Sequence, residues 1–71
     1  MSKYEQLCDD VYEQALSDWY PEIDVEATVN RFAHALRTDH PDMSEKTFNG
    51  VLSAFRRGFA DAAADWNTSK G

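Results

Sequence analysis

Apolar residues recur three or four positions apart over residues 45–66, which places them on one side of a helix. They are Phe48, Val51, Leu52, Phe55, Phe59, Ala62, Ala63 and Trp66. Ser44 precedes the pattern and suits the N-cap, while Met43 and Phe48 occupy the two positions of a hydrophobic staple. The pattern predicts one long amphipathic helix at the C-terminal side of the chain.

Two shorter helices are predicted before it, over residues 3–19 and 25–38. The first begins with a capping-box pattern, Ser2-Lys3-Tyr4-Glu5, and the second follows Asp24, a good N-cap. The apolar stripe of the first helix is Tyr4, Leu7, Cys8, Val11, Ala15 and Trp19. The apolar stripe of the second helix is Val25, Val29, Phe32, Ala33 and Leu36.

Proline marks both turns between these helices. Pro21 disfavours a helical conformation for Tyr20, so Trp19 and Tyr20 are expected in a turn with their aromatic side chains close to the core. Pro41 stops the second helix near residue 38, and the small polar tail 67–71 is expected to be flexible. The sequence therefore predicts a single all-α domain over residues 1–71, a small antiparallel three-helix bundle with a long C-terminal helix.

The last predicted helix is longer than the other two, so its C-terminal end is expected to be uncovered. At about 1.5 Å per residue the last helix spans roughly 34 Å, against about 27 Å and 20 Å for the other two, so it should extend past them. Apolar residues on an uncovered end would mark an interaction site. The residues predicted to bind a partner, or a second copy in a homodimer, are Gly58, Phe59, Ala62, Ala63 and Trp66.

Small residues also recur at four-residue steps along the same helix, at Gly50, Ala54, Gly58 and Ala62. A glycine inside a helix is less favourable than alanine by about 1 kcal/mol. The row therefore predicts close packing of this side of the helix against another element.

Negative charge is concentrated in the first third of the chain. Residues 1–26 contain eight acids and one lysine, whereas residues 27–71 contain five acids and six basic residues, which together give the net charge of −6. Glu5, Asp9 and Glu13 form a row at four-residue steps with Asp10 beside it. This row is either a solvated face that keeps a small protein soluble or a docking face for a basic protein surface, on which the carboxylates stand in for nucleic-acid phosphates.

A helix-turn-helix arrangement is the main alternative. In that case Lys46, Asn49, Ser53 and Arg57 of the third helix would face the major groove of DNA. Phosphate neutralisation supplies most non-specific DNA affinity, and a chain with a net charge of −6 offers little of it. Nucleic-acid binding is therefore not favoured, and Arg56 and Arg57 are expected to pair with acids of the first helix or of a partner.

No motif for catalysis, cofactor binding or metal binding is present. Cys8 is the only cysteine and is expected to pack as a small apolar residue, so no intrachain disulfide is predicted. His34 and His40 lack a second ligand at helical spacing and are expected to have surface or capping roles. With no long apolar segment in the sequence, we expect a soluble cytoplasmic protein without an enzymatic function, a cofactor or a membrane association.

These features predict a binding protein. The chain is expected to act as an inhibitor or adaptor of a larger protein or complex that offers a basic or apolar surface, and to form a homodimer. A small acidic chain without catalytic motifs also fits a phage or mobile-element accessory protein, although no motif carries that association. The alternatives from other classes are the DNA-binding regulator and a structural subunit of a homo-oligomeric assembly.

Overall fold

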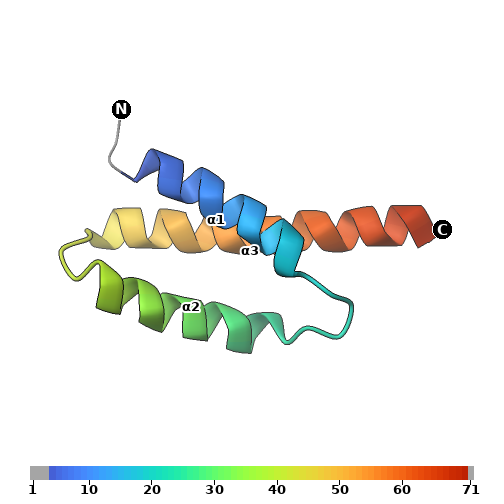
Figure 1. The fold of residues 1–71 in the computed structure, drawn as a ribbon, viewed down its shortest axis with the longest axis horizontal. Helices are drawn as coiled ribbons and strands as arrows, with labels where there is room; N and C mark the ends of the chain where they lie inside the picture. Colours follow the sequence, from blue (N-terminus) through green and yellow to red (C-terminus); the bar gives the residue numbers. More distant parts are fainter. Residues whose placement is uncertain (1–3, 71) are drawn as a thin grey trace.

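Three α-helices make up the fold in the computed structural model, which describes residues 4–70 and only the backbone of Lys70. They are α1 (Glu5–Asp18), α2 (Val25–Asp39) and α3 (Glu45–Lys70), and the described residues contain no strand. Successive helices run in opposite directions, with the long α3 in the middle (Figure 1). The predicted fold class, a small antiparallel three-helix bundle with a long C-terminal helix, is confirmed.

Two of the predicted N-caps are present. The Asp24 side chain accepts a hydrogen bond from the backbone N–H of Ala27 at 3.1 Å, and the Ser44 hydroxyl accepts one from the N–H of Thr47 at 3.2 Å. Each satisfies a backbone donor that the first turn of a helix leaves without an intrahelical partner. Ser2, the predicted cap of the first helix, lies outside the described residues, and Tyr4 occupies the N-cap position of α1.

Two details at the helix ends differ from the sequence prediction. Tyr20 is 53% exposed rather than close to the core, although Trp19 beside it does pack against the core. Helix α3 continues past the predicted end at Trp66 through residues 67–70, and the Thr68 hydroxyl donates to the carbonyl of Ala64 at 3.0 Å. The small polar composition of residues 67–71 suggested a frayed tail, but neither glycine nor proline interrupts the helix before residue 71.

The core forms along α3, because α1 and α2 each pack on that helix and none of their described Cα atoms come within 8 Å of each other. Every buried hydrophobic residue belongs to a predicted apolar stripe. These residues are Val11 and Ala15 of α1, Val29 and Leu36 of α2, and Phe48, Val51, Phe55 and Phe59 of α3. Helix α3 thus supplies half of the buried core and is the element that holds the other two in place.

Helix α1 crosses α3 at Gly58. A Cβ atom placed on Gly58 would lie 2.5 Å from the Cβ of Ala15 and 2.7 Å from the backbone oxygen of Tyr12. Ala15 is completely buried in this contact. The close packing predicted from the row of small residues is therefore present at Gly58, whereas a Cβ on Gly50 would meet nothing within 4 Å.

Aromatic stacking and surface ion pairs fix α2 against α3. The rings of Phe32 and Phe55 stack with their centroids 4.3 Å apart. Near one end of this contact the Arg37 guanidinium lies 3.9 Å from the centre of the Phe48 ring, and near the other Arg56 donates to Glu26 at 2.8 Å. Arg56 thus pairs with an acid of α2 rather than with the acid row of α1, and because the pair is exposed to solvent it is screened and adds little to stability.

Candidate protein-binding surface

All four residues of the predicted acid row are exposed on α1. Glu5, Asp9 and Glu13 follow one line along the helix at four-residue steps, on the side that also carries Tyr12. Asp10 lies beside this line and accepts a hydrogen bond from the Gln6 amide at 3.0 Å. The structure therefore places three carboxylates along one edge of α1, next to the line where α1 meets α3.

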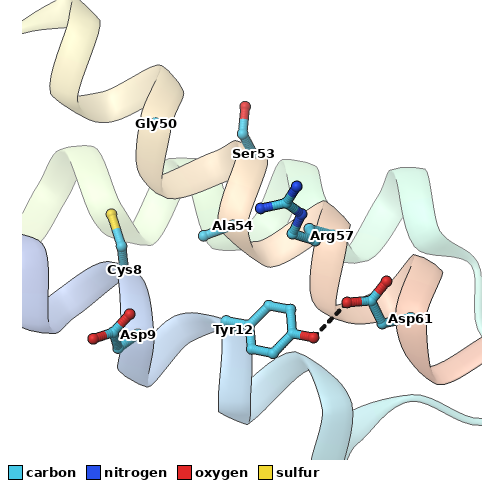
Figure 2. A pocket seen from close by; sticks show the side chains of 8 residues that line it. All are labelled: Cys8, Asp9, Tyr12, Gly50, Ser53, Ala54, Arg57 and Asp61. Atoms are coloured by element: carbon cyan, nitrogen blue, oxygen red, sulfur yellow. Dashed lines mark hydrogen bonds between the residues drawn. The ribbon is translucent and has the colours of Figure 1, made fainter.

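A groove runs between this edge of α1 and α3. Figure 2 shows that side chains of both helices face it. It is lined by Cys8, Asp9 and Tyr12 of α1 and by Gly50, Ser53, Ala54, Arg57 and Asp61 of α3. We call this hollow the first groove; among its described lining residues Arg57 is the one cation, beside the acids Asp9 and Asp61.

A hydrogen bond closes one end of the first groove, where the Tyr12 hydroxyl donates to the Asp61 carboxylate (Figure 2). This bond, with smaller contributions from desolvation and from the charge of Asp61, raises the pKa of Tyr12 above its ordinary value. Burial, followed by the negative charges of Asp9 and Glu5, raises the pKa of the Cys8 thiol. Cys8 also packs against the core, as a small apolar residue is expected to do.

The residues of the DNA-binding alternative are exposed on α3, but they do not form a basic surface. Ser53 and Arg57 line the first groove opposite Asp9, while Lys46 and Asn49 lie towards the start of the helix. Helix α2 lies alongside α3 over most of the length of α2 (Figure 1), as in an αα-hairpin. The two helices of a helix-turn-helix cross at a steep angle instead. DNA approaching this side of α3 would meet the carboxylates of α1.

The C-terminal end of α3 differs from the predicted surface at two positions. Gly58 and Phe59 are buried within the single chain, and Phe59 is only 2% exposed. The reason is the tilt of α1, whose Ala15 rests on Gly58 and carries α1 across this turn of α3. Ala62 and Ala63 are partly buried, and Trp66 is 44% exposed. The apolar area that a homodimer would cover is therefore smaller than predicted, and the homodimer itself stays a prediction.

A second groove lies beyond the crossing, where α1 ends and α3 continues. It is lined by Leu16, Trp19, Asp61, Ala62, Asp65, Trp66 and Ser69. The rings of Trp19 and Trp66 lie 6.3 Å apart and are tilted by 54° to each other. Because Asp61 lines both grooves, they form one continuous surface, which we call the α1–α3 face.

Sequence reasoning identified only part of the second groove. Ala62 and Trp66 were predicted, whereas Leu16, Trp19, Asp61, Asp65 and Ser69 were not assigned to any site. Asp61, Asp65 and Ser69 recur at four-residue steps and thus share one side of α3, a signal that could have been found. Their proximity to Trp19 could not be found, because it depends on where α1 crosses α3.

The histidines do not contribute to this face. His34 is exposed on α2, and the ring of His40 meets the Tyr4 ring edge-on with the centroids 5.7 Å apart. Within residues 4–70 no group of three or more His, Cys, Asp or Glu side chains is arranged to hold a metal ion. None of the described helices is both long and apolar enough to cross a membrane.

The Tyr12–Asp61 bond gives a prediction for alkaline solution. Since the folded state raises the pKa of Tyr12, the bond contributes its full stabilisation below the ordinary tyrosine pKa of about 10 and loses it as the pH rises through the folded value. Wild-type protein is therefore expected to be more stable than Tyr12→Phe at neutral pH, and the difference should shrink above about pH 10. Thermal unfolding followed by circular dichroism across this range measures the difference.

Tyr20→Phe is the matched control, because it removes a hydroxyl from an exposed side chain. Its melting temperature should follow that of the wild type at every pH. A Tyr12→Phe difference that stayed constant up to strongly alkaline pH would show that the bond to Asp61 does not stabilise the fold.

Comparisons of the chain with protein-family models, with curated proteins and with solved structures found no match. Its function is therefore inferred from the chemistry of its own surface.

Proposed function

We propose that the protein is a non-enzymatic binding protein of the cytoplasm that acts as an inhibitor or adaptor of a larger protein or complex. It docks through the α1–α3 face and the adjoining acid row onto a basic surface of its partner. The observation that carries the proposal is the exposure of Trp66, at 44%, on a groove that also contains Asp61 and Asp65. A large aromatic residue on an acidic groove suits an interface, because tryptophan is enriched among the residues that dominate binding energy.

The negative charge of this surface favours a partner with a basic surface. The described lining residues of the two grooves include Asp9, Asp61 and Asp65 and one cation, Arg57, and Glu5 and Glu13 lie along the edge of the grooves. Such a surface repels phosphate backbones and attracts basic protein surfaces, and it increases the rate of their encounter. A partner that normally holds nucleic acid would be blocked in this way, since the carboxylates occupy the places of phosphates.

The described groove residues also support a role without catalysis. Neither groove is lined by a histidine, and the pKa of the Cys8 thiol is raised rather than lowered. A catalytic cysteine needs the opposite, a pKa lowered by a neighbouring base or cation.

Neutralising the acid row tests the proposal. The variant Glu5→Gln/Asp9→Asn/Glu13→Gln removes three charges from the edge of the α1–α3 face. Affinity capture from the native host cell should retain the partner on wild-type protein, and the variant should bind that partner at least about tenfold more weakly, with a reduced dependence on salt. The matched control is Glu22→Gln/Asp39→Asn/Asp42→Asn, which removes the same charge from exposed positions away from this face.

Equal loss of binding in both variants would show that total charge matters and that the acid row does not. Retardation of DNA by the wild type at physiological salt would instead support the DNA-binding alternative through Lys46, Asn49, Ser53 and Arg57. Sedimentation equilibrium of the purified chain separates a homodimer or a larger homo-oligomer from a monomer that binds a different protein.

A further inference from the structure

The second groove combines two chemical features that recognise one kind of side chain. Trp19, at the end of α1, and Trp66 of α3 line it together with Asp61 and Asp65, which lie one helical turn apart on α3. Tryptophan is the aromatic side chain that attracts cations most strongly, and carboxylates attract them further. We propose that this groove receives an arginine side chain from a basic segment of the partner, an assignment that rests on the proposed function and names what its face binds.

The carboxylates of the groove have no ion-pair partner among the side chains that the structure describes. The ion pairs among the described side chains are Arg37–Glu45 and Arg56–Glu26, and neither includes Asp61 or Asp65. Asp61 accepts the hydroxyl of Tyr12, which fixes its position without neutralising its charge. Two carboxylates at a four-residue spacing repel each other on a helix, and a bound cation relieves that repulsion.

The shape of the groove favours arginine over lysine. The two indole rings are tilted by 54° with their centroids 6.3 Å apart, and Asp61 and Asp65 line the same groove, so one cation can meet both an aromatic face and a carboxylate there. A guanidinium is planar, stacks on aromatic faces and donates to two carboxylate oxygens at once, whereas an ammonium is a compact, strongly hydrated charge. Leu16 and Ala62 also line the groove and offer apolar surface to the aliphatic part of an arginine.

A second copy of this chain fits the groove less well than a basic partner does. A two-fold dimer places the same patch of both subunits face to face, so Asp61 and Asp65 would oppose their own counterparts. The net charge of −6 on each chain adds to that repulsion.

The two tryptophans make the test direct, because they are the only ones in the chain and both line the groove. The probes are a short capped peptide of alternating arginine and leucine, the same peptide with citrulline, which is neutral and of similar shape, and a third with lysine. We expect the arginine peptide to change the tryptophan fluorescence saturably and to bind about tenfold or more tightly than the citrulline peptide, with the lysine peptide between them. Higher salt should weaken the binding of the arginine peptide more than that of the neutral citrulline peptide.

Variants locate the binding within the groove. Asp65→Asn should lower the affinity for the arginine peptide several-fold. Asp42→Asn, the same charge change in the turn before α3, should leave that affinity unchanged. Trp66→Ala should lower the affinity for the arginine peptide about tenfold, and Trp66→Phe should lower it less. The anisotropy of a dye on the peptide measures both affinities. Circular dichroism of each variant confirms that the helices are intact.

Three results would overturn the assignment. They are equal affinity for the arginine and citrulline peptides, unchanged affinity in Trp66→Ala, or a homodimer that Trp66→Ala dissociates, which would place a second copy in the groove. Its failure is distinguishable from failure of the proposed function. A captured partner that is lost from the acid-row variant but retained by Trp66→Ala would keep a binding function through the acid row and remove the arginine site.

Discussion

Replacing Phe59 with alanine is expected to lower the free energy of unfolding by about 3–5 kcal/mol, the range found for removing a buried phenylalanine ring. Phe59 is 2% exposed, and the centroid of its ring lies 4.7 Å from the centroid of the Phe55 ring within the core. The total stability of a chain of 71 residues is on the order of 4–10 kcal/mol, so the variant should be largely unfolded or close to it. Urea unfolding followed by circular dichroism measures the loss.

Trp66→Ala is the matched control, because it removes a larger ring from a later turn of the same helix. Trp66 is 44% exposed, so its removal should lower the free energy of unfolding by about 1 kcal/mol, the hydrophobic contribution of a partly buried side chain. A homodimer would make the urea midpoint of the wild type rise with protein concentration, whereas a monomer would leave it unchanged. A smaller loss for Phe59→Ala than for Trp66→Ala, or a midpoint that rises with concentration, would show that a second chain covers this end of α3.

Hydrophobic periodicity was sufficient to predict the helices and the residues of the core. The buried side chains of α3 all lie in the stripe of its apolar pattern, and Asp24 and Ser44 cap α2 and α3 as their sequence context predicts. These features depend on neighbours within about one helical turn, and such local preferences can be read from a single sequence.

The arrangement of the helices could not be predicted in the same way. Helix lengths alone placed both Phe59 and Trp66 on an uncovered end of α3, but the structure covers one and exposes the other. The difference depends on where α1 crosses α3 and at which tilt, which is set by the contact of Gly58 with Ala15. The row of small residues predicted a close contact, but it did not show that Gly58 rather than Gly50 makes it.

The same distinction between local and tertiary features applies to the candidate site. Glu5, Asp9 and Glu13 belong to one helix, so their common edge follows from their spacing alone. The second groove brings Trp19 together with Trp66, residues far apart in the sequence, and their proximity is a result of tertiary packing. The acidic character of the surface was therefore predictable, whereas its aromatic groove was not.

The crossing at Gly58 also connects stability to the proposed binding. It lies between the two grooves, because Tyr12 lines the first and Leu16 lines the second on either side of Ala15. A change in the distance between α1 and α3 at this point would alter both grooves and separate Trp19 from Trp66.

Alanine substitutions at the two helical glycines should therefore have opposite effects. In Gly50→Ala the new methyl group meets nothing within 4 Å, so the variant gains the helix preference of alanine and is stabilised by up to about 1 kcal/mol. In Gly58→Ala the methyl group would meet the Cβ of Ala15 at 2.5 Å and the backbone oxygen of Tyr12 at 2.7 Å, so α1 itself must shift. Overpacking of this kind costs about 1–3 kcal/mol, and contact with backbone places it at the upper end, for a net loss of about 2 kcal/mol.

For a domain of this size the two variants should differ in melting temperature by more than about 10 °C, since 1 kcal/mol corresponds to roughly 4–8 °C. Gly58→Ala should also change the tryptophan fluorescence, because a displaced α1 moves Trp19 away from Trp66, whereas Gly50→Ala should leave the fluorescence unchanged. Equal stabilisation of both variants would contradict the close crossing. It would mean that α1 does not rest on Gly58, and then neither the burial of Phe59 nor the groove between Trp19 and Trp66 would follow.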